Sequence, residues 1–488
     1  MILEGQELHG LTYGDVSGVP GYYAGESRWD VSVEPIEHRL TRVNIPFVVA
    51  NMSRISDCVE MTETVARRGG VAVISQTTSI EEAERIIAHN KNASLEYESV
   101  GTVTTSATLR EATRVMHRRA HDAVIVVDEK EPDKPIGIIT KSDMEGKDDG
   151  LSVVRHASFD LQAMDAGLTE SEMLGWFREH NHRVAPVVTR EGKLAGVMTK
   201  LSVARSHIYA PAVDNDNRLL TAAAVGVNGD VAGRVEQLVA AGVDIIVIDT
   251  AHGHQKKMKL ALRAARSVVP RPFPVVAGNV VTRKAVYDLT NWGADVIKVG
   301  IGPGHMCTTR VMTSFGVPQL KAVKDCAREA DKLNVFTWAD GGIRDPRDAI
   351  IALAAGASNV MIGSLLAGTY ESAGEVEVDP QSGLLYVRNH GMASRVAIEA
   401  RNGGQEEDYI KQFKREYFEE GIPDGIVFLN PDMPGVQDLI DYFMSGLRSA
   451  ETYAGAKNLK RFRRVARYVI QNEAGHSEGK AKKVLAVS

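Results

Sequence analysis

Short apolar runs alternate with amphipathic stretches along most of the chain, which is the pattern of successive strand–helix units. Eight of these runs are predicted to be buried strands: Phe47–Ala50, Val71–Ser75, Ala222–Gly226, Asp244–Asp249, Pro274–Gly278, Asp295–Val299, Val335–Asp340 and Asn359–Gly363. Segments with helical spacing separate most of them, for example Val231–Ala241, Met258–Val268, Arg283–Trp292, Val317–Leu333 and Pro346–Ala355. Eight parallel strands with intervening helices predict an α/β fold, a TIM (β/α)8 barrel with its active site at the carboxyl ends of the strands.

The stretch between the second and third predicted strands is too long for a simple βα connection. It contains an internal repeat, because the pattern of Ala123–Asp143 recurs in Val184–Ser202, and each copy follows a helix-like stretch. We therefore divide the chain into a first barrel segment (1–92), an insert (93–206) with repeats at about 95–147 and 153–206, and a second barrel segment (207–488). The insert can be interpreted as a passive dimerisation module or as a ligand sensor.

The segment Gly300–Arg310 follows the sixth predicted strand and reads Gly-Ile-Gly-Pro-Gly-His-Met-Cys-Thr-Thr-Arg. Its glycines permit backbone conformations that turn carbonyl and amide groups inward. Cys307 in such a loop is predicted to be a nucleophile, with Thr309 as a proton-handling neighbour. A buried structural cysteine beside a tight turn is the alternative interpretation.

The other predicted strands also end in residues suited to ligand binding. In this fold, backbone amides of glycines after the seventh and eighth strands commonly bind a phosphate. Asp340 beside them can accept hydrogen bonds from ribose hydroxyls. Asp249 is expected to contact a second ligand, although capping a helix would also explain it. The predicted ligand contacts at these strand ends are Asn51, Met52, Asp249, Thr250, Ala251, Asp340, Gly341, Gly342, Gly363 and Ser364.

Composition and charge restrict the possible partners. The chain has 488 residues, a formal net charge of −6 and three cysteines, which are too widely spaced for a disulfide framework or metal cluster. An acidic chain without a long apolar segment argues against nucleic acid or membrane as the main partner. We expect a cytoplasmic protein.

The cysteine loop, Asp340–Gly342, Gly446–Ser449 and the insert together resemble the IMP dehydrogenase/GMP reductase family, and the insert resembles a pair of CBS motifs (a Bateman domain). The resemblance implies that Cys307 attacks the purine base at C2, that Thr309 and Glu420 handle protons, and that Gly391, Met392 and Ser394 lie at the base. It also implies a nicotinamide cofactor near Asp249–Ala251, Gly300 and Gly302. By analogy with the dehydrogenases, the resemblance implies that carbonyls of Gly300, Gly302 and Cys307 hold a monovalent cation, K⁺. His305 stands where the family usually has serine, so one phosphate contact is expected to be altered.

For the insert, the resemblance implies ATP or GTP as an allosteric ligand, bound near Thr140, Asp143 and Thr199. Asp143 has the family's ribose-contacting position, whereas the second copy has Ser202 there. A homotetramer is implied, and pairing of the inserts would double it to an octamer.

The direction of the reaction depends on a polar segment, a flap predicted at about 383–421. In the family, the dehydrogenase flap carries an adjacent Arg-Tyr pair that activates water, but this chain has Glu-Glu-Asp-Tyr at Glu406–Tyr409 and Arg-Glu-Tyr at Arg415–Tyr417. The resemblance therefore favours NADPH-dependent reduction of GMP to IMP in purine salvage. Oxidation of IMP to XMP with NAD is the alternative, and an inactive nucleotide sensor is a third.

Overall fold

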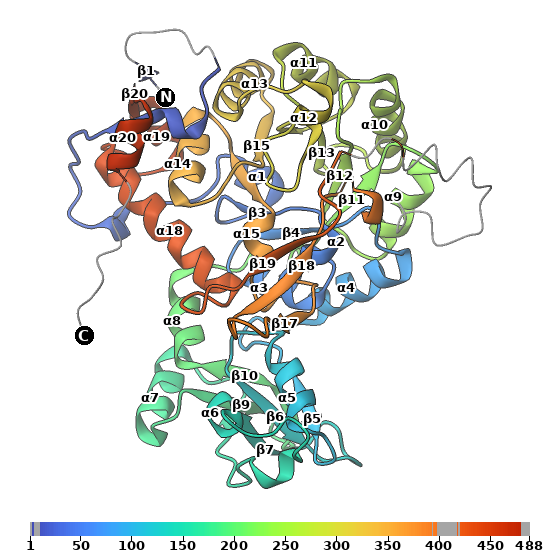
Figure 1. The fold of residues 1–488 in the computed structure, drawn as a ribbon, viewed down its shortest axis with the longest axis vertical. Coiled ribbons are helices and arrows are strands. Elements are labelled where there is room, and N and C mark those ends of the chain that lie inside the picture. The colour runs from blue at the N-terminus through green and yellow to red at the C-terminus, as the bar shows by residue number, and fades with distance from the viewer. Residues whose placement is uncertain (1, 4–9, 393, 398–416, 418–419, 480–488) are drawn as a thin grey trace.

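The computed structural model describes residues 2–3, 10–392, 394–397, 417 and 420–479 (Figure 1). Eight parallel strands close into a barrel in the order β11-β12-β13-β14-β15-β16-β3-β4. Their bounds are Phe47–Val49 (β3), Val71–Ile74 (β4), Ala222–Gly226 (β11), Ile245–Asp249 (β12), Val275–Val280 (β13), Val296–Val299 (β14), Phe336–Asp340 (β15) and Asn359–Ile362 (β16). The predicted TIM barrel is confirmed.

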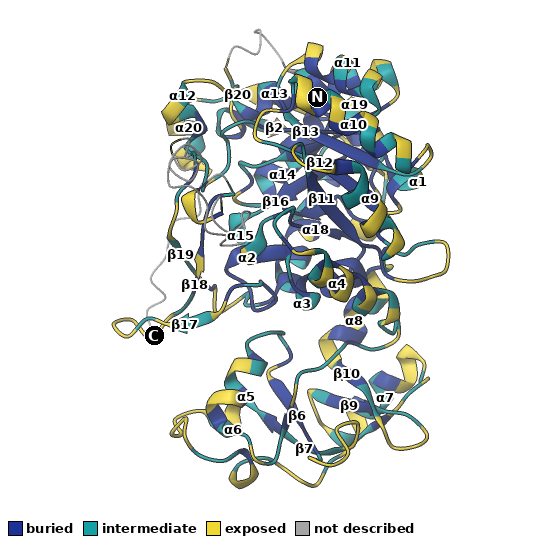
Figure 2. Cartoon of the chain, turned by 90° about the vertical axis from the view of Figure 1, so that its right-hand side faces the viewer, coloured by how far each residue is buried: buried dark blue, intermediate teal, exposed yellow. Residues whose placement is uncertain are grey.

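The barrel strands are mostly apolar because both of their faces are buried. Residues such as Val48, Val73 and Trp338 fill the barrel interior, whereas Phe47, Ile74 and Ile246 pack against the surrounding helices. Figure 2 shows this buried core running through the barrel. Strands covered on both sides have continuous hydrophobic runs, which is why the sequence revealed them.

Helices follow the strands and form the outer layer. The longer ones are Val59–Arg67 (α3), Ile80–Asn92 (α4), Val231–Ala240 (α9), Lys256–Val268 (α10), Arg283–Trp292 (α11), Gln319–Leu333 (α13), Pro346–Ala355 (α14), Val436–Tyr453 (α18) and Leu459–Val465 (α19). Short ones are His38–Thr41 (α1), Ser53–Ser56 (α2), Thr309–Thr313 (α12), Ser364–Ala367 (α15) and Glu473–Glu478 (α20). The start of α14 is well specified, since Asp345 caps it and Pro346 occupies its first turn.

The insert between α4 and β11 folds as two similar units, each with a three-stranded sheet. The first contains Thr102–Thr104 (β5), Leu109–Met116 (α5), Ala123–Val127 (β6), Pro135–Thr140 (β7) and Lys141–Met144 (α6). The second contains Met164–Asp165 (β8), Glu170–His180 (α7), Val184–Val188 (β9), Leu194–Thr199 (β10) and Lys200–Ile208 (α8). Both units have the order β-α-β-β-α, and Figure 1 shows them as a separate module below the barrel.

Ion pairs join this module to the barrel, one of them buried (Arg119–Glu63) and one partly exposed (Arg205–Asp441). Arg119, after α5, lies 2.6 Å from the carboxylate of Glu63 on α3, and Arg205 on α8 lies 2.8 Å from Asp441 on α18. Burial alone would raise the pKa of Glu63, but Arg119 and its other partners outweigh that effect and hold it well below its ordinary value. An ion pair therefore attaches each unit of the module to a helix of the barrel.

Two smaller sheets complete the fold. One joins Ile2–Leu3 (β1), Val16–Val19 (β2) and Arg467–Ile470 (β20), and the other joins Val376–Val378 (β17), Leu385–Asn389 (β18) and Gly425–Phe428 (β19). The predicted flap at 383–421 therefore begins with a strand, β18. Its Glu406–Tyr409 segment lies outside the described residues, and of Arg415–Tyr417 only Tyr417 is described.

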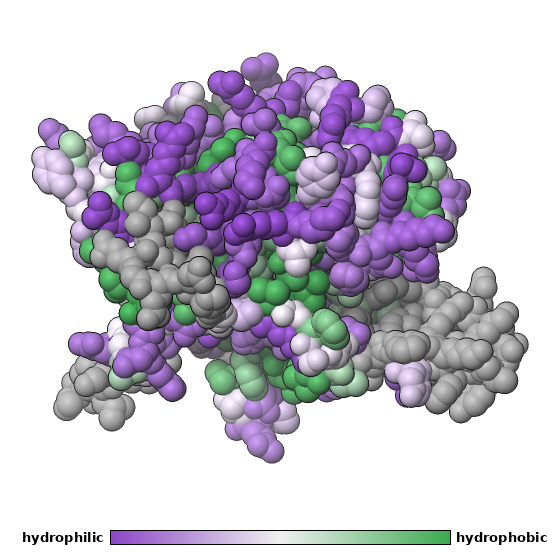
Figure 3. Space-filling view, turned by 90° about the horizontal axis from the view of Figure 1, so that it is seen from above, coloured by the Kyte–Doolittle hydropathy of each residue, from purple (hydrophilic) through white to green (hydrophobic). Residues whose placement is uncertain are grey.

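The surface seen from above is mostly hydrophilic, with hydrophobic side chains in smaller patches (Figure 3). No helix within the described ranges has both the length and the apolar composition needed to cross a membrane.

Candidate active site

A cavity of about 660 Å³ opens at the carboxyl ends of the barrel strands. Residues after β3, β12, β13, β14, β15 and β16 line it, as expected for the active site of such a barrel. The predicted residues that line it are Asn51, Met52, Asp249, Thr250, Ala251, Gly300, Gly302, Cys307, Thr309, Asp340, Gly341, Gly342, Gly363, Ser364, Gly391, Met392 and Glu420.

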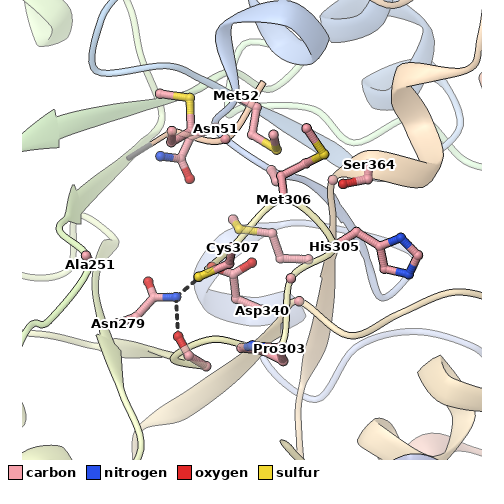
Figure 4. Close-up of a pocket in the computed structure, with 18 of the residues that line it drawn as sticks. Asn51, Met52, Ala251, Asn279, Pro303, His305, Met306, Cys307, Asp340 and Ser364 are labelled. Atoms are coloured by element: carbon pink, nitrogen blue, oxygen red, sulfur yellow. Dashed lines mark hydrogen bonds between the residues drawn. The ribbon is translucent and has the colours of Figure 1, made fainter. Parts of the chain in front are cut away.

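The cysteine loop is shaped by its glycines. Gly302 has a positive φ of 80°, a conformation that side chains with a Cβ rarely adopt. A Cβ on Gly300 would lie 2.1 Å from the backbone oxygen of Asp340, so glycine is required there for close packing against β15. The loop places Cys307 in the middle of the cavity (Figure 4). Cys58 and Cys326 are buried elsewhere, and burial raises the pKa of both thiols.

Cys307, Thr309 and Glu420 form a chain of hydrogen bonds. The Cys307 thiol lies 3.3 Å from the Thr309 hydroxyl, which donates to Glu420 Oε2 at 2.7 Å. The backbone fixes this arrangement, since the Thr308 amide donates to the Glu420 carbonyl at 3.1 Å. Residues separated by more than a hundred positions thus form one thiol–hydroxyl–carboxylate relay.

Lys298 is a functional residue that the sequence reasoning missed. It lies on β14 with its side chain in the cavity, 2.6 Å from Asp249 and 2.8 Å from Asp340. Burial alone would lower its pKa, but the two carboxylates outweigh burial and raise it, so the ammonium stays charged. The sequence feature that could have revealed Lys298 as a site residue is a charged side chain within an otherwise apolar strand.

Two amides complete this polar network. Asn51 donates to Asp249 Oδ2 at 3.1 Å, and Asn279, also not predicted, donates to Asp340 Oδ2 at 2.8 Å. Both acids predicted to bind ligand hydroxyls are therefore oriented by Lys298 and by one amide each.

Glycine backbone lines the cavity after β15 and β16. Gly341 and Gly342 have positive φ values of 87° and 77°, and a Cβ on Gly341 would come within 3.0 Å of Pro303. A Cβ on Gly363 would lie 2.9 Å from the sulfur of Met52. Gly341 and Gly342 thus keep Cβ atoms away from this part of the wall, where Ser364 and the backbone amides can approach a phosphate.

Four predicted residues lie outside the cavity. Ser394 is buried, and its hydroxyl accepts a weak bond from the Ala397 amide at 3.4 Å. The other three are in the insert: Asp143 Oδ2 accepts from the Thr140 amide at 2.8 Å, and the Thr199 hydroxyl donates to Ser202 at 2.8 Å. These contacts cap α6 and α8.

The predicted cation ligands are backbone carbonyls. The Gly300 carbonyl accepts from Asn279 Nδ2 at 2.7 Å, and Arg310 donates to the Ile301 carbonyl at 3.1 Å. Neither contact uses the carbonyls of Gly302 or Cys307, so K⁺ at this loop stays a prediction. Within the described residues, no group of three or more His, Cys, Asp or Glu side chains could hold a metal ion. His254, one of two loop histidines, instead lies 2.8 Å from Asp288.

The fold and the site define a barrel enzyme with a cysteine nucleophile at the strand ends. A family model described as the IMP dehydrogenase / GMP reductase domain matches residues 10–482. The chain belongs to the IMP dehydrogenase/GMP reductase family and is an oxidoreductase.

Several relatives cover nearly the whole chain. GMP reductase from Mycobacterium tuberculosis is 42% identical over 469 residues, which are 96% of both chains. Inosine-5'-monophosphate dehydrogenase from Bacillus subtilis is 35% identical over 474 residues, 96% of this chain and 94% of the relative. Among solved structures, a cysteine-to-alanine variant of GMP reductase from Trypanosoma brucei in complex with guanosine 5'-monophosphate has a TM-score of 0.66 and 31% identity, and the match covers 98% of each chain.

Proposed function

We propose that this chain is a GMP reductase, which converts GMP and NADPH into IMP, ammonia and NADP⁺. The relay from Cys307 through Thr309 to Glu420 carries the proposal, because deamination needs a proton delivered to the departing nitrogen. The higher identity to a GMP reductase, 42% against 35% for a dehydrogenase, supports the same direction. So does the sequence of 383–421, which contains no adjacent Arg-Tyr pair for activating water.

The first half of the reaction removes the amino group. The Cys307 thiol passes its proton through the Thr309 hydroxyl to Glu420, and the thiolate adds to C2 of GMP. The electron pair of the C2=N3 bond moves to N3, which takes a proton from water. Glu420 then returns its proton through Thr309 to the amino group. Ammonia leaves with its bonding electrons, the C2=N3 bond re-forms and N3 gives its proton back to water.

The second half reduces C2. A reduced nicotinamide held beside Asp249, Thr250 and Ala251 would supply the hydride that forms the C2–H bond, and the electron pair of C2=N3 would again move to N3. The C2–S bond breaks as C2=N3 is restored, which releases IMP and the Cys307 thiolate. The thiolate takes up one proton, so the whole reaction consumes GMP, NADPH and one proton. No step requires a cation at the cysteine loop. Binding of K⁺ there by the carbonyls of Gly300, Gly302 and Cys307 stays a separate prediction.

The cavity can hold both substrates at once. GMP would place its base over Cys307 with its edge toward Gly391 and Met392, its ribose toward Asp340, and its phosphate along the glycine wall after β15 and β16. The nicotinamide would approach from Asp249, Thr250 and Ala251. Figure 4 shows Ser364 and Ala251 on opposite sides of Cys307, as this arrangement requires.

Lys257 supports NADPH as the cofactor. Asn228, after β11, lines the cavity across the barrel from β15, and the exposed Lys257 donates to its Oδ1 at 2.6 Å. Lys256 and Lys259 lie in the same turn of α10, whose first turn contains no acidic residue. Positive charge at this rim suits the phosphate that distinguishes NADPH from NADH.

We further propose that the insert is a CBS pair that binds ATP or GTP, with Thr140, Asp143 and Thr199 near the nucleotide. Its two β-α-β-β-α units and their ion pairs to α3 and α18 support a regulatory role. A homotetramer, or an octamer formed through the inserts, and a place in cytoplasmic purine salvage complete the proposal.

The deciding experiment is an absorbance assay of the reduced nicotinamide. Loss of the signal with GMP and NADPH, abolished in Cys307→Ala, is expected. Cys326→Ala, a change at a buried thiol far from the cavity, is the matched control. Gain of signal with IMP and NAD, without turnover of GMP, would identify a dehydrogenase instead.

The insert is tested separately. ATP or GTP should raise the melting temperature of the full chain and change the rate of the active reaction. Asp143→Asn should weaken both effects, whereas Asp165→Asn, an exposed aspartate in the second unit, should not. No response to either nucleotide would contradict the sensor role.

A further inference from the structure

One aromatic pair crosses the boundary between the insert and the barrel. Tyr370 lies three residues beyond α15, and its ring is almost fully buried. The ring stacks on the imidazole of His117, which directly follows α5: the ring centroids are 5.1 Å apart and the planes differ by 9°. In Figures 1 and 2, α5 lies on the side of the module beneath β17 and β18. The stack therefore joins the first unit of the insert to the barrel side of the boundary.

Two routes lead from Tyr370 to the catalytic cavity. The first is α15, whose first residue, Ser364, lines the cavity, and Thr369, between α15 and Tyr370, is fully buried. The second is β18, because the ring belongs to the same buried cluster as Val387 on that strand. Two residues after β18 ends, Gly391 lines the cavity. Because close-packed groups shift together, a displacement of the ring would be felt at two walls of the cavity.

His117 lies beside the helix that contains part of the predicted nucleotide site of the insert. α5 contacts α6 through Thr113, whose hydroxyl lies 3.8 Å from the sulfur of Met144. α6 begins at Lys141 and contains Asp143. Burial, followed by the positive charge of Lys141, lowers the pKa of His117, so the stacked ring is neutral near pH 7. A ligand held at α6 would thus be separated from the ring pair by one packed helix.

The ion pairs between the module and the barrel lead elsewhere. Arg119 pairs with a residue of α3 and Arg205 with residues of α18, and no described residue of these two helices lines the cavity. A weaker contact reaches the same segment as Tyr370, since Arg118 Nη1 donates to the Ser372 carbonyl at 3.4 Å. The ion pairs therefore attach the module, whereas the ring pair contacts elements that shape the catalytic site.

We propose that the stack of His117 on Tyr370 couples the first unit of the insert to the catalytic cavity, so that a ligand bound at either place changes the affinity at the other. Such coupling is reciprocal by thermodynamic linkage, and it requires each ligand to prefer one arrangement of the shared element. An aromatic pair shifts an equilibrium by about two- to tenfold, which sets the size of the expected coupling.

This inference rests on the proposed function for the identity of the two ligands, GMP in the cavity and ATP or GTP at the insert. The absorbance assay first establishes whether GMP or IMP is the substrate, and that nucleotide is then used throughout. Binding of ATP or GTP to wild type, measured by calorimetry, tests the sensor role by itself. Failure of either assignment is thereby separated from failure of the coupling.

Hydrogen exchange of the full chain measures the coupling with the substrate alone. In wild type, saturating GMP should slow amide exchange in residues 109–127 of the insert about two- to tenfold. The slowing should disappear in His117→Leu and remain in His117→Phe, which keeps an aromatic ring at that position. His180→Leu is the matched control: His180 stacks on Trp176 with centroids 4.2 Å apart, but both rings belong to α7 of the second unit.

Calorimetry with both ligands measures the same coupling from the other side. In wild type, the dissociation constants of ATP or GTP with and without GMP should differ by about two- to tenfold. They should become equal in His117→Leu, in Tyr370→Leu and in the double variant, because the two rings act as one pair. Tyr370→Phe, which keeps the ring, should behave as wild type.

The exchange data decide the outcome whether or not ATP or GTP binds. Exchange in 109–127 that does not respond to the substrate in wild type, or that responds equally in His117→Leu, would overturn the proposal. The two variants of His117 suffice even if Tyr370→Leu does not fold, since His117 is only half-buried.

Discussion

The hydroxyl of Thr309 donates to the carboxylate of Glu420 at 2.7 Å, although the two residues are 111 positions apart. The same hydroxyl lies 3.3 Å from the Cys307 sulfur. Thr309 therefore links a nucleophile to a group that can store its proton. Because the first half of the proposed reaction moves that proton away from the thiol and later delivers it to the departing amino group, the relay should limit the rate when it is interrupted.

Replacing Thr309 by valine should interrupt the relay while keeping the shape of the side chain. We expect kcat to fall by about 10²–10⁴, the usual contribution of a positioned proton donor. Glu420→Gln should have a similar effect, and Thr309→Ser should retain most activity. Steady-state kinetics with GMP and NADPH provide the measurement. Thr290→Val, on α11 far from the cavity, is the control, and wild-type kcat in Thr309→Val would rule out the relay.

Lys298→Met should destabilise the protein, because it leaves Asp249 and Asp340 as two partly buried acids without their shared, buried cation. Removing one partner of a buried ion pair typically costs about 3–5 kcal/mol of unfolding free energy. Urea denaturation measures the change. Lys284→Met, which removes a surface lysine paired with Asp288, should cost less than about 1 kcal/mol. Similar losses for the two variants would contradict the importance assigned to Lys298.

Lys257→Ala should change cofactor preference rather than nucleotide binding. We expect kcat/KM for NADPH to fall about tenfold, as for the loss of one charged contact to a phosphate, while kcat/KM for NADH changes little. Both are measured at saturating GMP, with Lys332→Ala on α13 as the control. An equal fall for both cofactors would show that Lys257 does not recognise the additional phosphate.

Glu451 should make stability depend on pH. It is fully buried, and within the described structure neither of its carboxylate oxygens has a hydrogen-bond partner. Burial raises the pKa of Glu451 from the ordinary glutamate value of 4.5 to about 8, although Arg448 opposes the shift. Folding therefore takes up a proton between pH 4.5 and 8, so this group's contribution to stability is present at low pH and is lost as pH rises toward 8.

The variant that tests this pH dependence is Glu451→Gln, which removes the titrating carboxyl group. Chemical denaturation at intervals from pH 5 to 9 should show that wild type loses stability relative to the variant by at most about 1.4 kcal/mol per pH unit. Glu236→Gln, on the exposed side of α9, should run parallel to wild type. Parallel curves for Glu451→Gln would mean that this carboxylate is hydrated or paired in solution.

Much of the fold could be predicted because most positions of the barrel strands are apolar and buried. Val71–Ile74 and Asn359–Ile362 are buried at every position, so hydrophobic runs located them within one or two residues. The two units of the insert were equally visible, since their repeated pattern does not depend on tertiary contacts.

The polar network was harder to predict because it depends on geometry across the barrel. Lys298 stood in an apolar run and gave no sign that it would face Asp249 and Asp340, which lie on two other strands. The contact of Asn279 with Asp340 likewise depends on the order in which strands close the barrel. By contrast, Cys307 and Thr309 are neighbours in sequence, so their proximity could be expected.

The place of the insert also affects how the chain folds. β3 and β4 pair with each other, but β4 also pairs with β11 and β3 with β16, so each of them gains its second neighbour only after much more of the chain has been synthesised. Such long-range pairings slow folding and leave strand edges unpaired for longer. An insert that folds early on its own would shorten the effective loop between β4 and β11, because ion pairs such as Arg119–Glu63 hold it beside the strands it separates. The module would then act as an internal folding clamp for the barrel during synthesis.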